Sequence, residues 1–294
     1  EVPEARKSTA PIDTAEAAKV LAQYLTDVVQ KGLENVQDNG GGIDAQIQLA
    51  NQIVTTIQNT TQEADFAALG VDQRAEQLLA LLRKNDPRLA AGKAAKDIER
   101  PETSLAQSSL FTGAIHEPQM YTELKKEIVS ADRIDMLVSF IKWSGLRLIM
   151  DELREFTQNG GELRIITTSY MGATDVKAIE ELRKLPNAHI KVSYNTKTTR
   201  LHAKAYIFYR ETGFTTAYVG SSNLSNAALT SGLEWNTKVT KRDLPETIDK
   251  IAATFEYYWN DREFEYYAED QKERLARALK AYNFNDTATA EIYT

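Results

Sequence analysis

The strongest constraint on the fold is an alternation of apolar runs and amphipathic segments in the middle of the chain. RIDMLVSFI (133–141), ELRIITTSY (162–170) and HIKVSYN (189–195) are short and rich in β-branched residues, as strands are. The segments between them, at 145–161 and 175–186, carry apolar residues at the three- and four-residue steps of a helix. Crossovers of this length join parallel strands, so the pattern predicts an α/β fold.

Three further strand-like runs follow at 201–209, 215–223 and 232–240, with the sequences LHAKAYIFY, TTAYVGSSN and GLEWNTKVT. A short polar turn separates the first two, and such a connection joins antiparallel neighbours. Added to the parallel unit, these runs predict a mixed β-sheet flanked by helices.

The α/β region takes up only part of the chain. We expect residues 1–12 to be disordered, while helical periodicity over 13–87 predicts a small all-α N-terminal module. Residues 88–108 are mixed in character and polar, which is typical of a linker. The α/β domain is assigned to 109–245, and residues 246–294 return to a helical pattern. Nothing in the N-terminal module suggests catalysis, and it is interpreted as a packing or partner-binding bundle.

Composition narrows the chemistry further. The chain has no cysteine, which excludes disulfides, thiol nucleophiles and zinc–thiolate sites and fits a cytoplasmic protein. No run approaches 18 apolar residues, so we expect no transmembrane helix and no membrane partner. The net charge of −7 argues against a general nucleic-acid coat but leaves room for a local basic groove. Because the chain begins at Glu1 without Met or a signal peptide, we expect it to be a processed or excised piece.

Four residues of the last strand-like runs form a set that suits attack on a phosphodiester. His202 and Lys204 lie two apart, Asn223 follows in GSSN, and Glu234 follows in GLEWN. A neutral imidazole is a good nucleophile toward phosphorus, and a carboxylate on its other nitrogen fixes the tautomer. A lysine and an asparagine amide stabilise the charge that builds on the phosphoryl oxygens. This chemistry needs no metal and no cofactor, but it needs a second histidine to protonate the leaving oxygen.

The same residues resemble the signature of the phospholipase D superfamily, His-x-Lys-x4-Asp followed by Gly-Ser-x-Asn. The chain has His202, Lys204 and then Gly220-Ser221-Ser222-Asn223, but Tyr209 occupies the Asp position. A branch of the superfamily that includes a metal-independent restriction endonuclease also lacks this Asp, and a Glu downstream of the Asn completes its site. The resemblance implies that Glu234 fills that role here and that 109–245 form a phospholipase-D-like nuclease domain.

A narrower resemblance concerns the phospholipase-D-like module at the N-terminal side of certain DEAD/DEAH-box helicases. Those modules are similar to this chain across VSFIKWSGLR, TTSYMGATD, TRLHAKAYIF and YVGSSNLSNAALTSGLEWN, and the resemblance is strongest over 120–240. It implies that a helicase domain follows the C-terminal helical segment. The chain contains no GxxxxGK[ST] motif, so we expect no P-loop ATP site in this piece.

The chain holds one H-x-K pair, whereas a complete site of this superfamily uses two. The simplest solution is a homodimer with the site on its two-fold axis. The alternative is a cryptic second half within the chain, but no other H-x-K occurs.

Several other residues are candidates for substrate contact. Locally basic sequence around the site, together with the helicase-like resemblance, favours DNA over lipid as the partner. For Ser221 and Ser222 the sequence leaves two roles open, a phosphate contact or formation of the turn. Trp143 and Tyr170 follow strand ends, where open α/β sheets bind ligands. Core packing is the alternative role for both aromatic residues. The candidate phosphate contacts are Lys197, Arg200 and Lys238, with Lys241 and Arg242 nearby. His116 and His189 have no partner pattern and are expected in a loop and at the surface.

The sequence therefore predicts a metal-independent DNA endonuclease or nickase that works through a phosphohistidine, within a helicase-linked restriction or repair protein. The alternative is a catalytically degenerate module that binds DNA or dimerises for a helicase. A phospholipid hydrolase is a third hypothesis, disfavoured because no amphipathic membrane helix is evident.

Overall fold

A computed structural model describes residues 9–76, 99–195, 201–230 and 232–290, with side chains up to residue 281. The chain divides into two compact units, Glu1–Leu78 and Leu79–Thr294. None of the helices in the described ranges is long and apolar enough to cross a membrane.

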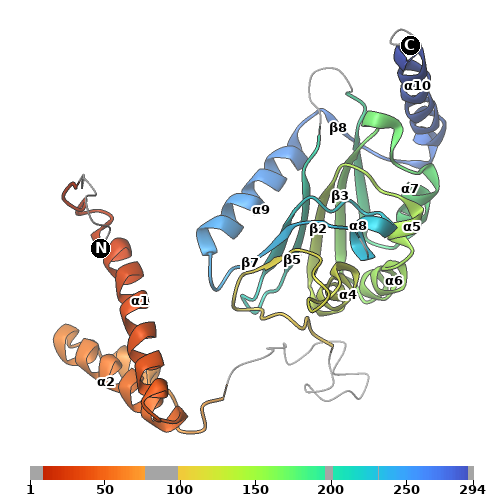
Figure 1. The fold of residues 1–294 in the computed structure, drawn as a ribbon. Coiled ribbons are helices and arrows are strands. Elements are labelled where there is room, and N and C mark those ends of the chain that lie inside the picture. The colour runs from red at the N-terminus through yellow and green to blue at the C-terminus, as the bar shows by residue number, and fades with distance from the viewer. Residues whose placement is uncertain (1–8, 77–98, 196–200, 231, 291–294) are drawn as a thin grey trace. The chain divides into compact units, whose positions relative to one another are not determined.

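The N-terminal unit is a helical hairpin with a short extension (Figure 1). It consists of α1 (Ala17–Asp38), α2 (Ile43–Thr61) and the 3₁₀ helix η1 (Ala64–Leu69). Gly41, between α1 and α2, has no room for a side chain because a Cβ there would lie 2.7 Å from the carbonyl oxygen of Val36. Ile47 is the one buried apolar side chain among its described residues. The predicted third helix begins in residues 71–76, which are turn and loop, and continues outside the described residues.

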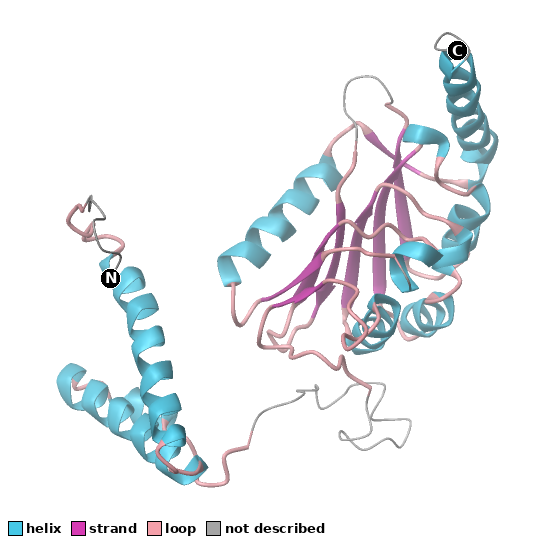
Figure 2. Ribbon diagram, viewed as in Figure 1, coloured by secondary structure: helices cyan, strands magenta, loops and turns pink. Residues whose placement is uncertain are grey.

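The second unit is built on one mixed sheet of eight strands, in the order β1-β7-β6-β5-β2-β3-β4-β8 (Figure 2). Strands β2, β3 and β4 run parallel, and the other neighbours are antiparallel. The predicted mixed α/β sheet is therefore confirmed. The strands are β1 (Ser109–Phe111), β2 (Arg133–Val138), β3 (Glu162–Thr168), β4 (Ala188–Ser193), β5 (Lys204–Tyr209), β6 (Thr216–Gly220), β7 (Asn236–Thr240) and β8 (Phe264–Tyr266).

Helices cover both faces of this sheet (Figure 1). The larger apolar core lies on one face, and α9 alone contributes the helical part of the smaller core on the other, through Ile248, Phe255 and Trp259. The remaining described elements of this unit are α4 (Met120–Ser130), α5 (Trp143–Leu146), α6 (Met150–Gln158), η3 (Tyr170–Gly172), α7 (Val176–Arg183), α8 (Asn226–Thr230), α9 (Pro245–Asn260), η4 (Glu269–Gln271) and α10 (Lys272–Ala290).

Part of the predicted linker, 88–108, is packed structure. Its described residues begin at 99, and Pro101 and Leu105 are buried. The carboxylate of Glu123 on α4 accepts hydrogen bonds from the backbone N–H groups of Glu102 and Thr103, at 2.7 and 3.2 Å. The segment from residue 99 onward is therefore attached to the second unit.

Candidate active site

The predicted catalytic residues all lie at one edge of the sheet. The register pairs Lys204, at the start of β5, with Val138 at the end of β2, and it pairs Gly220, at the end of β6, with Asn236 at the start of β7. The C-terminal ends of β2, β3 and β4 lie at the same edge because these strands are parallel. His202, Asn223 and Glu234 each lie one to three residues beyond a strand end at this edge.

His202 and Glu234 lie in loops, although their apolar surroundings predicted strands. β5 begins at Lys204 and β7 at Asn236, so both residues precede their strands. β6 ends at Gly220, where a Cβ would lie 2.1 Å from the carbonyl oxygen of Trp235, so the two chain segments are in close contact at this point. Loop positions free both side chains from the sheet and leave His202 exposed.

His202 and Lys204 are in direct contact. The Nζ of Lys204 lies 3.0 Å from Nδ1 and 3.3 Å from Nε2 of His202, and it donates a hydrogen bond to the carbonyl oxygen of His202 at 2.7 Å. The ring of Phe140, just after β2, meets the imidazole edge-on at 6.2 Å between centroids. The hydroxyl of Ser139 donates to the carbonyl oxygen of Ala203 at 3.1 Å and ties the histidine loop to β2. Sequence reasoning missed Ser139 and Phe140, which have no motif of their own.

Lys204 is nearly buried, and its charge is balanced by Glu234. Burial lowers the pKa of the Lys204 ammonium, while the Glu234 carboxylate acts in the opposite direction. Glu234 is half-buried and makes no hydrogen bond to His202 or to any other described residue through its carboxylate. The structure thus places Glu234 near Lys204, and its predicted role in orienting His202 stays a prediction.

Asn223 is oriented by the backbone of β2's end. Its Oδ1 accepts a hydrogen bond from the N–H of Phe140 at 3.1 Å. Because the oxygen is assigned to that donor, the Nδ2 group points elsewhere, and no described residue accepts from it. The amide therefore has donors available at the same edge as His202.

The two serines of GSSN differ. Ser222 is fully buried, and its hydroxyl accepts from Nδ2 of Asn236 at 2.7 Å and donates to the carbonyl oxygen of Ala228 at 3.3 Å. This favours the turn-forming role for Ser222. Ser221 is exposed, and its hydroxyl accepts from the N–H of Trp235 at 3.1 Å. Of the two serines, only Ser221 is accessible to a substrate.

The aromatic candidates at the strand ends are both half-buried. Trp143 opens α5, packs against the larger core and carries the Nζ of Lys177 at 4.4 Å from its ring centroid. Its backbone N–H donates to the carboxylate of Asp175 at 2.8 Å. Tyr170 lies in η3 after β3, with its N–H bonded to Oγ1 of Thr168 at 3.0 Å. Both residues lie at the predicted edge, and the contacts of Trp143 favour the packing alternative.

The prediction of Lys238 as a phosphate contact is wrong. Lys238 lies inside β7 and is fully buried, and its Nζ is 3.0 Å from Oε1 of Glu127 and 2.7 Å from Oγ1 of Thr103. Sequence alone did not reveal the buried acid on α4 that binds this lysine. Lys241 and Arg242 follow the far end of β7, at the edge opposite His202, where Lys241 pairs with Asp249. Lys197 and Arg200 lie outside the described residues.

Tyr209, at the position of the missing Asp, is far from the site. It ends β5 and pairs with Arg133 at the start of β2, and the guanidinium of Arg133 lies 3.8 Å from its ring centroid. Five residues of strand separate it from Lys204, about 17 Å at the usual rise. Loss of an acid at this position therefore removes nothing from the edge that holds His202.

The other two histidines are exposed, as predicted. His116 lies in the loop after β1, and His189 lies near the start of β4, at the opposite edge of the sheet. Within the described ranges, no three His, Asp or Glu side chains converge as a metal site would require.

The candidate site lies within a segment that matches a known family. Residues 124–259 match the family model described as cardiolipin synthase, PLD-like domain. No protein with curated annotation matches the chain.

Among solved structures, NucT from Helicobacter pylori is 20% identical over 51% of this chain and 94% of its own, with a TM-score of 0.39. Nuc from Salmonella typhimurium, a phospholipase D family member, is 19% identical over 55% of this chain and 100% of its own, with a TM-score of 0.43. A phosphatidylserine synthase from Haemophilus influenzae is 16% identical over 61% of this chain and 43% of its own, with a TM-score of 0.42.

The matched residues 124–259 include His202, Lys204, the GSSN turn and Glu234. This segment, a little under half of the chain, therefore resembles a PLD-like domain.

Proposed function

We propose that the second unit is a metal-independent phosphodiesterase that cleaves DNA through a phosphohistidine. The observation that carries the proposal is the exposed imidazole of His202, in contact with the ammonium of Lys204, at the edge where Asn223 offers free amide donors. In-line attack at phosphorus requires a nucleophile, a cation and a neutral hydrogen-bond donor. All three lie at this edge of the sheet.

The reaction needs two copies of His202. A ring nitrogen of the first His202 forms a bond to phosphorus, and the bond from phosphorus to the leaving oxygen breaks. That oxygen takes a proton from the His202 imidazolium of a second chain. Water then attacks the phosphohistidine, its proton passes to the second imidazole, and the nitrogen–phosphorus bond breaks. Because the chain has a single H-x-K pair, we propose a homodimer with the site on its two-fold axis.

DNA is proposed as substrate because four stretches within 120–240 resemble helicase-linked modules and because the sequence around the site is locally basic. The substrates of NucT, Nuc and the phosphatidylserine synthase are not carried over to this chain. A helicase-linked restriction or repair setting, and a cytoplasmic location, are part of the proposal and rest on that resemblance and on composition.

One observation favours a second candidate, a module that binds DNA without cleaving it. Glu234 makes no hydrogen bond to His202 within the described residues, so the group that is proposed to orient the nucleophile is not in place. Lys204 and Asn223 would still bind a phosphate oxygen in such a module.

The test is incubation of the chain with plasmid and single-stranded DNA in excess EDTA. We expect cleavage by the wild type and a loss of about 10⁴-fold or more in His202→Ala, as for removal of other catalytic nucleophiles. His189→Ala is the matched control, because His189 is exposed at the opposite edge. Acid-labile, alkali-stable phosphate on His202 during turnover identifies the intermediate, and light scattering gives the oligomeric state.

DNA binding without cleavage by either protein would support the binding module instead. Release of headgroup from a phosphatidylcholine analogue, with no DNA cleavage, would support the phospholipid hydrolase.

A further inference from the structure

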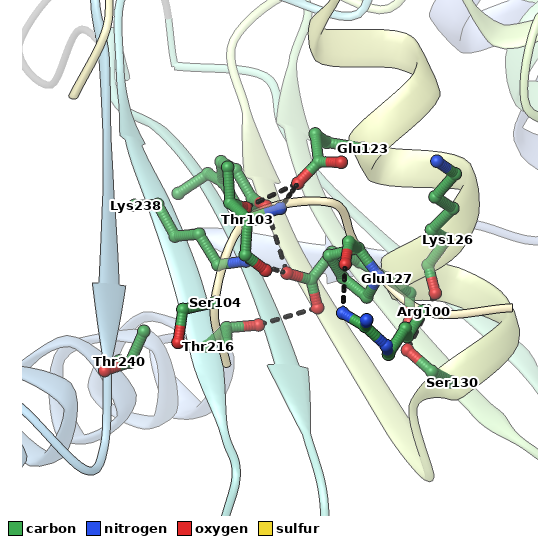
Figure 3. Close-up of polar contacts among 12 residues, drawn as sticks. Arg100, Thr103, Ser104, Glu123, Lys126, Glu127, Ser130, Thr216, Lys238 and Thr240 are labelled. Atoms are coloured by element: carbon green, nitrogen blue, oxygen red, sulfur yellow. Dashed lines mark hydrogen bonds and ion pairs between the residues drawn. The ribbon is translucent and has the colours of Figure 1, made fainter. Parts of the chain in front are cut away.

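A fully buried carboxylate connects the strands that carry the candidate site. Glu127 lies on α4 and is inaccessible to solvent, and Figure 3 shows it between Thr216, Thr103 and Lys238. Its Oε2 accepts from Nη2 of Arg210 at 2.5 Å and from Oγ1 of Thr216 at 2.8 Å. Its Oε1 accepts from Oη of Tyr218 at 3.0 Å and lies 3.0 Å from Nζ of Lys238.

The donors come from three neighbouring strands. Arg210 follows the end of β5, Thr216 and Tyr218 lie on β6, and Lys238 lies on β7. These are the strands whose other ends carry the H-x-K pair, the GSSN turn and Glu234. One carboxylate is therefore bonded to every strand that supplies a candidate catalytic residue.

The ions in this cluster are held in a charged state. Burial raises the pKa of the Glu127 carboxyl, but Arg210 and Lys238 outweigh this effect and lower it to about 2. Apolar side chains of similar volume often replace buried ion pairs without loss of stability. Selection of one register among several is the best-attested further role of a buried polar group. In a strand, a slip of one residue turns every side chain to the opposite face. Such a slip in β7 would remove Lys238 from Glu127 and Asn236 from Ser222 together.

The chain segment that precedes β1 completes the cluster. Oγ1 of Thr103 accepts from Nζ of Lys238 at 2.7 Å and donates to Oε2 of Glu123 at 2.5 Å. Thr103 is thus a direct connection between the segment that precedes β1 and strand β7, and Ser108 provides another through the N–H of Thr240. Lys238 is four residues from Glu234, about 13 Å along an extended chain.

We propose that Glu127, with Lys238 and Thr103, is a positioning cluster that sets the register of β5, β6 and β7. Through this register it places Glu234 and Asn223 relative to His202. The cluster touches no substrate. The inference rests on the proposed function for its kinetic consequence, but its structural consequence is independent of it.

The test uses Thr103→Val, which removes the hydroxyl and keeps the side-chain volume. We expect kcat for DNA cleavage to fall about tenfold, with KM within about twofold, since small misplacements of reacting groups are costly. Thr103→Ser keeps the hydroxyl and restores kcat. Thr157→Val is the matched control, because Thr157 is also buried but donates within its own helix, to the carbonyl oxygen of Leu153 at 2.9 Å. Glu127→Gln should lower kcat for DNA cleavage about 100-fold. If that variant does not fold, Thr103→Val still decides the test.

A second readout needs no turnover. The chain has three histidines, His116, His189 and His202. In Thr103→Val at fixed pH, the imidazole proton resonance of His202 should move while those of His116 and His189 stay. If wild type does not cleave DNA, the proposed function fails and this spectrum still tests the positioning cluster. An unchanged His202 resonance, with unchanged kcat and a lower melting temperature, would overturn the positioning role and leave a purely structural one.

Discussion

The two units are both rich in helices, but they differ in what their helices bury. In the second unit, helices on both faces of the sheet enclose apolar cores. In the first, α1 has no buried residue, and Leu21, Tyr24 and Leu25 are each at least half exposed. The comparison shows that the same sequence periodicity produces a helix in either place, while a core also needs a second layer to pack against.

Charge separates the units as well. Residues 9–76 contain three basic and ten acidic residues, a net charge of −7 that equals the net charge of the whole chain. The rest of the chain is therefore neutral overall. The argument that acidity disfavours nucleic-acid binding applies to the N-terminal unit and leaves the second unit free to bind a polyanion.

The same substitution in both units should give the largest contrast. Phe208 is fully buried in β5 and meets Tyr218 edge-on at 6.0 Å, whereas Phe66 is half-buried in η1. We expect Phe208→Ala to lower the free energy of unfolding by about 3–5 kcal/mol. Phe66→Ala should cost about 1 kcal/mol, close to the average for point mutants. Urea unfolding followed by circular dichroism measures both, and equal losses would show that the N-terminal unit has a core of comparable quality.

Removal of a lysine should affect activity in one unit alone. Lys204→Met removes the ammonium that contacts His202, and we expect kcat to fall about 10²–10³-fold, as for loss of one transition-state donor. Lys31→Met is the control, because Lys31 is exposed on α1 of the acidic unit. DNA cleavage in EDTA is the measurement. Similar losses in both variants would mean that the N-terminal unit also contacts the substrate.

Acid should destabilise the second unit through Glu127. Its pKa is about 2 in the folded chain against 4.5 without the surrounding structure, so its contribution is complete above pH 4.5 and is lost as pH falls toward 2. The shift corresponds to on the order of 3 kcal/mol. All three tryptophans, Trp143, Trp235 and Trp259, lie in the second unit, so tryptophan fluorescence during urea unfolding reports on it alone. A midpoint that stays constant between pH 5 and pH 2.5 would contradict this contribution.

Much of the second unit could be predicted from sequence, because its signals are local. The alternation of β-branched runs with amphipathic segments gave β2, β3 and β4 as parallel strands. The spacing of His202, Lys204 and Asn223 grouped them as one site, and the structure places them at one edge of the sheet. Strand ends were less certain: apolar character continues through Leu201 and Leu233, while the strands begin at Lys204 and Asn236, where pairing with a neighbour begins.

The failures concern contacts between distant parts of the chain. Lys238 was interpreted as a surface cation because its partner, Glu127, is more than a hundred residues earlier and on a helix. The packed end of the predicted linker was missed for the same reason, because the partners of Thr103 are Glu123 and Lys238, which lie far along the chain. Periodicity identifies which face of a helix or strand is buried. It does not identify a charged residue from a distant part of the chain that contacts that face.

One ammonium group serves two partners at the candidate site. Nζ of Lys204 contacts the ring nitrogens and carbonyl oxygen of His202, and it is also the cation proposed to bind a phosphoryl oxygen. An anion that attracts this ammonium therefore competes with the imidazole for it and leaves the ring lone pair free. By thermodynamic reciprocity, whatever occupies that lone pair must in turn change the affinity of the site for the anion by the same factor. Ligand capture and release of the nucleophile are then two descriptions of a single equilibrium.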